Sequence, residues 1–224
     1  MTSPPAHAAP GGLAAPATSA YDAAMVWPLL LCAGLAFALP AIADEQAVLA
    51  RGKSIVSASC FLCHGMHGEA ASELSPRLAG QNAAYLAKQL ANFRTGERRS
   101  SAMRPMVAQL SGDDMRAVAL YFSRQRAEPH LPTDARLAAR GKSIYEKGGG
   151  ATEVAACIGC HGEGAQGSES LPRLAGQFPA YLATQLRQFG SRERTNDNAV
   201  MQKVALRMTV EEIEAVAAYL SSLD

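Results

Sequence analysis

Two copies of the pentapeptide Cys-x-x-Cys-His, at residues 60–64 and 157–161, carry the clearest chemistry in this sequence. The spacing is typical of c-type haem attachment, because two thiols add to the haem vinyl groups and the histidine that follows can bind the iron. The sequence therefore predicts two covalently bound haem c groups. The predicted attachment residues are Cys60, Cys63, Cys157 and Cys160, and the predicted axial iron ligands are His64 and His161.

Two other chemistries use the Cys-x-x-Cys spacing. A single zinc site would need both pairs to converge on one ion, but the two copies are far apart in the sequence and each has its own flanking motifs. A thioredoxin-like dithiol would need a β-α-β pattern, and no segment of the sequence alternates as a strand does. Haem attachment is therefore the preferred interpretation.

The sequence is a tandem duplication. Residues 50–55 recur unchanged at 139–144, and residues 76–81 recur unchanged at 172–177. Such self-similarity indicates one domain of roughly 80–90 residues present twice. We predict domains at 44–126 and 135–224, joined by a proline-containing linker at 127–134.

Helical periodicity dominates both copies. Apolar residues recur at helical spacing in four segments, 44–57, 82–94, 133–146 and 178–189. Residues 111–114 and 209–212 have the pattern of capping boxes, so each is expected to open a terminal helix that ends near Arg124 or Ser222. The predicted class is all-α in two domains.

The second axial ligand decides whether the iron has a free coordination position. His67 lies too close to His64 to reach the opposite haem face, and His130 falls in the linker, so methionine is the better candidate. Aligning Ser111 with Thr209 leaves one position that is methionine in both copies, each expected in a loop before the terminal helix. The predicted ligands are Met103 and Met201, with Met106 as the alternative in the first domain.

Each Cys-x-x-Cys-His is followed by Pro-Arg-Leu-Ala-Gly-Gln and then by Tyr-Leu-x-x-Gln-Leu. These motifs resemble the diheme cytochrome c4 family over residues 44–224. The resemblance implies two tandem class I cytochrome c domains, each wrapped around one covalently bound haem. It also implies that the carbonyl groups of Pro76 and Pro172 accept a hydrogen bond from the ligating histidines, and that Arg77 and Arg173 serve haem propionates.

The N-terminal region has the features of a targeting segment. An apolar run, Val26–Leu39, is too short to span a membrane comfortably and precedes the small-x-small sequence Ala41-Ile42-Ala43. We predict that residues 1–43 are such a segment, with translation starting at Met25 and cleavage after Ala43. The expected location is the periplasm, and an uncleaved membrane anchor is the alternative.

Filled coordination at both irons predicts an electron carrier and not an enzyme. The resemblance implies transfer from a quinol-oxidising complex or another donor to a terminal oxidase, with loose membrane association through these partners. A cytochrome subunit of a periplasmic dehydrogenase is the first alternative, and a diheme peroxidase is the second. The net charge of +1 is too small to indicate nucleic-acid binding.

Overall fold

The computed structural model describes residues 39–70, 72–127 and 134–224. Its contacts divide the chain into two units, Met1–Ala43 and Asp44–Asp224. The predicted targeting segment up to residue 38 and most of the predicted linker, residues 128–133, lie outside the described residues. In the described ranges no helix is both long and apolar enough to cross a membrane.

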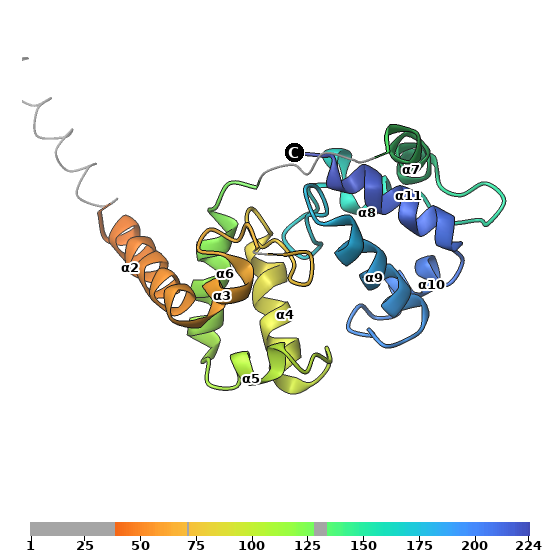
Figure 1. Cartoon of the computed structure of the whole chain (residues 1–224). Helices are drawn as coiled ribbons and strands as arrows, with labels where there is room; N and C mark the ends of the chain where they lie inside the picture. The colour runs from red at the N-terminus through yellow and green to blue at the C-terminus, as the bar shows by residue number, and fades with distance from the viewer. Residues whose placement is uncertain (1–38, 71, 128–133) are drawn as a thin grey trace, which may run out of the picture. The chain divides into compact units, whose positions relative to one another are not determined.

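Helices form the whole regular structure of the described residues, apart from one isolated bridge between Gly149 and Val154 (Figure 1). This confirms the predicted all-α class. We call residues 44–127 the first half and residues 134–224 the second half. The first half contains the part of α2 (Leu39–Ile55) that begins at Asp44, together with α3 (Phe61–His64), α4 (Ala83–Thr95), α5 (Met103–Val107) and α6 (Gly112–Ser123). Those of the second half are α7 (Ala135–Lys147), α8 (Ile158–His161), α9 (Pro179–Gly190), α10 (Val200–Ala205) and α11 (Val210–Ser221).

Capping boxes start both terminal helices. The Ser111 hydroxyl accepts a hydrogen bond from the Asp114 N–H, and the Asp114 carboxylate accepts one from the Ser111 N–H, each at 3.0 Å. Thr209 and Glu212 make the same pair of bonds. Each box satisfies donors that the first helical turn leaves without intrahelical partners. The predicted starts of α6 and α11 are confirmed.

Two glycines let the first and last long helices of each half cross closely. A Cβ atom at Gly52 in α2 would overlap the carbonyl oxygen of Ala117 in α6. In the second half a Cβ atom at Gly141 in α7 would overlap the carbonyl oxygen of Ala215 in α11. The repeated Arg-Gly-Lys-Ser segment therefore has a packing reason, since only a residue without a side chain fits at the crossing.

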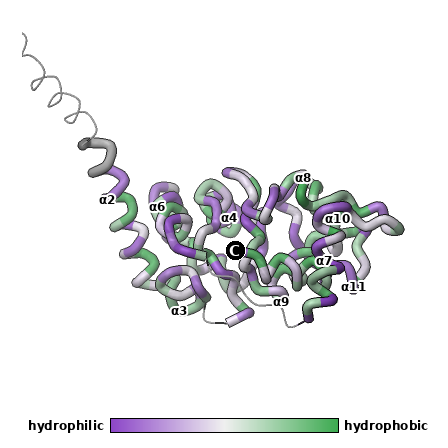
Figure 2. The backbone as a smooth tube through the Cα atoms, turned by 90° about the horizontal axis from the view of Figure 1, so that it is seen from above, coloured by the Kyte–Doolittle hydropathy of each residue, from purple (hydrophilic) through white to green (hydrophobic). Residues whose placement is uncertain are grey.

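Each half has its own core. Apolar side chains of its two crossing helices form the core together with those of α4 in the first half and of α9 in the second. Figure 2 shows hydrophilic and hydrophobic residues following one another along α2. The core of the first half includes Val56, Leu86, Val118, Tyr121 and Phe122. The core of the second half includes Ile144, Tyr145, Leu182, Val216 and Leu220.

The approach to the two Cys-x-x-Cys-His segments differs between the halves. In the first half a π-helical turn, η1 (Val56–Cys60), joins α2 directly to α3. In the second half α7 ends at Lys147, and the bridge between Gly149 and Val154 lies in the connection to α8. A single π-turn inside a helical run is often found at a functional site. Helical periodicity alone does not predict it, because the apolar positions hardly shift.

Candidate haem sites

His64 lies at the end of α3, buried, with its Nδ1 atom 2.9 Å from the carbonyl oxygen of Pro76. A carbonyl oxygen only accepts, so Nδ1 carries the proton and Nε2 keeps a lone pair. Burial lowers the pKa of His64 and outweighs the hydrogen bond to Pro76, which raises it. The imidazole is therefore held neutral, with Nε2 in the form that binds a metal.

His161 repeats this arrangement at the end of α8. Its Nδ1 atom lies 3.3 Å from the carbonyl oxygen of Pro172, and burial again lowers the pKa of the imidazole. Hydrogen bonding of this kind fixes both the tautomer and the orientation of a metal-binding histidine. The two halves thus present the same donor atom in the same setting.

The motif cysteines are free thiols placed on one short helical turn in each half. Cys60 and Cys157 are half-buried, whereas Cys63 and Cys160 are exposed. Burial raises the pKa of Cys60 and raises that of Cys157 to about 11. Two thiols and one neutral imidazole in each half are the donor set that a covalently bound haem requires, so these residues fit the group.

The sequence predicted that both methionine ligands lie in loops, but the structure places them in short helices. Met103 is the first residue of α5, and its N–H donates to the Ser100 hydroxyl at 3.1 Å. Met201 lies in α10, where the Asp197 carboxylate accepts from the N–H groups of Ala199 and Gln202. These side-chain acceptors lie before the N-cap residues and bind N–H groups at the starts of the two helices, which are too short to show in the hydrophobic period.

Packing distinguishes the methionines of the first half. Met103 is partly buried against Phe93, Val107 and Met115, whereas Met106 is 44% exposed. Met115 is fully inside the core. The structure thus places Met103 on an apolar cluster and Met106 at the surface, while the assignment of Met103 and Met201 as ligands stays a prediction.

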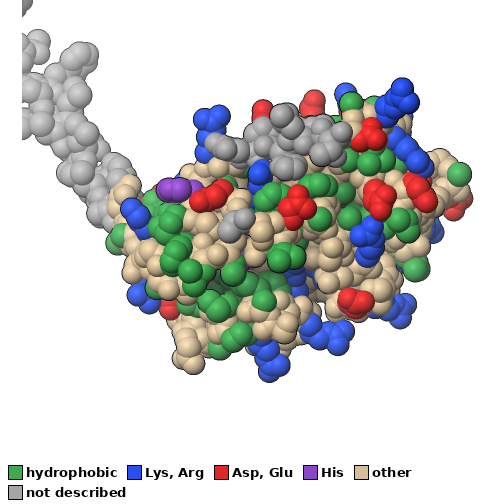
Figure 3. All heavy atoms as spheres, viewed as in Figure 1, with side chains coloured by type: hydrophobic (Ala, Val, Ile, Leu, Met, Phe, Trp, Pro, Cys, Tyr) green, Lys and Arg blue, Asp and Glu red, His purple; other side chains and the backbone are tan. Residues whose placement is uncertain are grey.

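Hydrophobic side chains gather over α3 and α4 on the face shown in Figure 3, while acidic and basic side chains are scattered over the rest of that face. The exposed residues of the first motif include Phe61 and Leu62, which are 37% and 67% exposed. An apolar area beside two free thiols suits a large apolar group such as haem. It gives the first site a wall as well as attachment atoms.

Arg77 and Arg173 have contacts that the sequence did not predict. The Arg77 guanidinium donates to the carbonyl oxygen of Gly176 at 2.9 Å and lies 4.6 Å from the centre of the Phe178 ring. The Arg173 guanidinium donates to the Gln166 side chain. Its buried Nε atom has no hydrogen-bond partner among the described residues, so it can still serve a carboxylate. The propionate role of both arginines stays a prediction.

Glutamine side chains join the two halves reciprocally beside these arginines. Gln81 accepts from the Arg173 N–H at 2.8 Å and donates to the Arg173 carbonyl oxygen at 2.9 Å. Gln177 makes the same two bonds to Arg77.

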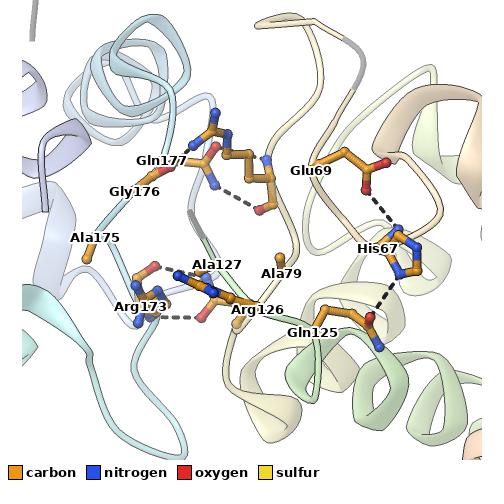
Figure 4. Close-up of a pocket in the computed structure, with 12 residues that line it drawn as sticks. His67, Glu69, Ala79, Gln125, Arg126, Ala127, Arg173, Ala175, Gly176 and Gln177 are labelled. Carbon is orange, nitrogen blue, oxygen red and sulfur yellow. Dashed lines mark hydrogen bonds between the residues drawn. The ribbon is translucent and has the colours of Figure 1, made fainter. Parts of the chain in front are cut away.

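A pocket of about 420 Å³ lies at this contact between the halves (Figure 4). Residues of both halves line it, and His67 is one of them. His67 Nδ1 lies 3.1 Å from Gln125 Oε1 on one side of this pocket.

A second reciprocal contact lies between α4, α9 and the loops that follow them. Arg98 donates to Tyr181 and Gln185 of the second half, and Arg194 donates to Tyr85 and Gln89 of the first half. All of these residues occur at equivalent positions of the duplicated sequence. Their repetition was visible in the sequence, but it did not show that they meet each other.

A helical fold with two such sites defines a c-type cytochrome with two covalently bound haem c groups. Comparison with known protein families supports this class. The family model described as Cytochrome c matches residues 138–224, and the one described as Cytochrome C oxidase, cbb3-type, subunit III matches residues 47–122.

Relatives that this chain matches over nearly their whole length show which family of c-type cytochromes it belongs to. Cytochrome c4 of Thiocapsa roseopersicina is 36% identical over 190 residues, covering 83% of this chain and 96% of that protein. The crystal structure of reduced recombinant cytochrome c4 from Pseudomonas stutzeri superimposes with a TM-score of 0.73 at 33% identity, covering 77% of this chain and 97% of that one. A protein of Stutzerimonas stutzeri strain A1501 named thiosulfate dehydrogenase electron acceptor is 36% identical, covering 88% of this chain and 94% of that protein. The chain belongs to the cytochrome c4 family and is an electron-transfer protein.

Proposed function

We propose that each haem iron has histidine and methionine as its two axial ligands, His64 with Met103 and His161 with Met201. The observation that carries this proposal is the recurrence of methionine at one equivalent position of both halves, before a capped terminal helix. When bound, the haem iron supplies one-electron Fe(II)/Fe(III) chemistry. The chain's own residues hold the imidazoles neutral and fix their orientation through Pro76 and Pro172.

With both axial positions filled, no position is left for a substrate, and the protein acts as a carrier. Rapid-mixing experiments with carbon monoxide on the reduced protein and cyanide on the oxidised protein test this. Slow binding at both haems is expected. Fast binding at one haem would instead indicate an open position and a diheme peroxidase.

We further propose that the mature protein works in the periplasm and passes electrons from a quinol-oxidising complex or another donor to a terminal oxidase. The support is its membership of the cytochrome c4 family and the apolar segment Val26–Leu39 with the following Ala41-Ile42-Ala43. The partners' own association with the membrane would bring the carrier to it. A fusion of residues 1–60 to a reporter that is active only outside the cytoplasm tests the export.

A second candidate is service as the electron acceptor of a dehydrogenase, since a relative with that name covers 88% of this chain at 36% identity. The two roles differ in the donor. The oxidised protein can be mixed either with membranes containing a quinol-oxidising complex or with a thiosulfate dehydrogenase and thiosulfate, and haem reduction followed by absorbance. Faster reduction by the membranes supports the respiratory role, and faster reduction by the dehydrogenase supports the second.

A further inference from the structure

Two arginines lie buried side by side between the halves, and neither donates a hydrogen bond to a carboxylate in the part of the chain that the structure describes. Arg98 and Arg194 are 9% and 7% exposed. Buried guanidinium groups are normally paired with an anion, because the charge is costly to remove from water. The ion pairs of the described residues involve neither of them, and their hydrogen-bond partners are neutral.

The two guanidinium groups also share acceptors. Arg98 and Arg194 each donate to Gln185 Oε1 at 2.8 Å, and both donate to Gln89 Oε1, at 2.8 and 3.2 Å. Like charges that meet at the same oxygen atoms repel each other. Two carboxylates lie nearby, since Glu97 accepts from Asn92 and Glu193 lines a cavity with both arginines, but both are exposed to water and neither is among the hydrogen-bond partners of Arg98 or Arg194. The two buried guanidinium groups therefore have no buried counter-ion among the hydrogen-bond partners given by the described side chains.

The position of the cluster indicates where a counter-ion comes from. Arg98 lies 4.6 Å from the centre of the Phe93 ring, and Phe93 packs in the apolar cluster that includes Met103. Arg194 lies 4.4 Å from the centre of the Phe189 ring in the second half. Phe189 belongs to α9, which packs on α10, the helix that contains Met201. Arg98 thus contacts the apolar cluster that includes Met103, and Arg194 contacts the helix that packs beside that of Met201. The bound haem brings carboxylates of its own to each half.

We infer that Arg98 and Arg194 form one shared counter-charge for the haem propionates of both halves. The inference rests on a haem in each half and on the proposed position of the methionine ligands. Each arginine reaches acceptors in its own half and in the other, namely Gln89 and Tyr181 for Arg98, and Gln185 and Tyr85 for Arg194. Removing one arginine therefore alters the electrostatics of both haems and not only of the nearer one.

The sign of the effect follows from the charge. A cation near the haem disfavours the extra positive charge of Fe(III), so it raises the reduction potential. The variant Arg98→Gln should lower the potentials of both haems in a spectroelectrochemical titration of the full diheme protein. The matched control is Arg99→Gln, because Arg99 is the adjacent, exposed arginine and the change in net charge is the same. The shift in Arg98→Gln should be several-fold larger than in the control.

Two results would overturn the inference. One is a shift in Arg98→Gln no larger than in Arg99→Gln, or confined to one haem. The other concerns a cavity of about 250 Å³ that is lined by Arg98, Arg99, Gln188, Glu193 and Arg194. If the wild-type potentials depend on added sulfate and Arg98→Gln removes that dependence, the counter-ion comes from solution. An unchanged sulfur-to-iron absorption band in Arg98→Gln separates either failure from a failure of the proposed axial ligands.

The conservative variant Arg98→Lys covers the case in which Arg98→Gln does not fold. It keeps the charge but loses the planar fork of donors. Redox-induced infrared difference spectra with haem labelled with ¹³C at the propionate carboxylates report the partner directly. The carboxylate bands should move between wild type and Arg98→Lys, whereas identical bands would show that Arg98 does not contact a propionate.

Discussion

Gln177 closes a ring of two hydrogen bonds on the backbone of Arg77, accepting from its N–H and donating to its carbonyl oxygen, each at 2.9 Å. The two residues belong to different halves, so neither half alone can form the ring. Gln81 and Arg173 form its equivalent. The segment after each Cys-x-x-Cys-His is therefore held by the other half, next to the proline that orients the iron-binding histidine.

Replacing Gln177 with alanine should loosen this segment. The Arg77 N–H and carbonyl groups would lose their partners, and a polar group left unpaired costs about 1–3 kcal/mol. Hydrogen exchange at the Arg77 amide is expected to become about tenfold faster or more. Gln109→Ala, on an exposed residue of the first half, is the control and should leave that amide unchanged. Equal exchange in the two variants would contradict the role of Gln177.

Met103→Ala and Met201→Ala should each remove about half of the weak long-wavelength sulfur-to-iron absorption of the oxidised protein, since each removes the thioether from one of two equivalent haems. Visible spectra of the oxidised variants check this. Met106→Ala is the matched control, because its side chain is 44% exposed in the same short helix. Loss of the band in Met106→Ala and not in Met103→Ala would move the first ligand to Met106.

Gly52→Ala and Gly141→Ala should each destabilise one half. The added methyl group would meet the carbonyl oxygen of Ala117 or Ala215, and overpacking of this kind typically costs about 1–3 kcal/mol. Thermal unfolding followed by circular dichroism measures the loss. Gly150→Ala should be nearly neutral, because a Cβ atom there meets nothing within 4 Å. A loss as large in Gly150→Ala would show that the crossing of the helices is not the cause.

Asp114 links the stability of the first half to pH. Hydrogen bonds from the Ser111 N–H, from Arg51 and from the Ser111 hydroxyl lower the pKa of this carboxyl group. A carboxyl group with a lowered folded-state pKa contributes stability above its unfolded pKa of about 3.9, and loses it as the pH falls through the folded value. The free energy of unfolding can be measured in urea from pH 6 down through roughly the range in which carboxylates titrate. It should fall less steeply with falling pH in Asp114→Asn than in the wild type. Asp113→Asn removes the same charge outside the capping box, and an equal flattening there would contradict the role of Asp114.

Local signals made most of the fold predictable. Ser111 and Thr209 could be identified as helix starts because a capping box lies within four consecutive residues. The short helix at Met103 escaped prediction, because its start is held by two bonds to Ser100, from the N–H groups of Met103 and Arg104, and it is too short for a hydrophobic period. The π-turn at Val56–Cys60 escaped for a similar reason, since it changes the backbone bonds and hardly the pattern of apolar residues.

The candidate site was predictable where its partners are close in sequence and unpredictable where they lie in the other half. The hydrogen bond of His64 to Pro76 spans a short loop and followed from the family resemblance. Arg98 and Gln185 are far apart, and no sequence pattern states which surfaces of two domains meet. Both residues recur in the duplicated sequence, as Arg194 and Gln89, but only the structure pairs them.

The reciprocal bonds between Gln81 and Arg173 and between Gln177 and Arg77 also bear on the history of the chain. A contact in which each partner offers the same residues to the other is self-complementary, like the interface of a twofold homodimer. A single-domain ancestor with these residues would have been equipped to pair with its own copy. Joining two copies in one polypeptide makes such pairing independent of concentration, so a dilute carrier arrives at its partner with both haems together.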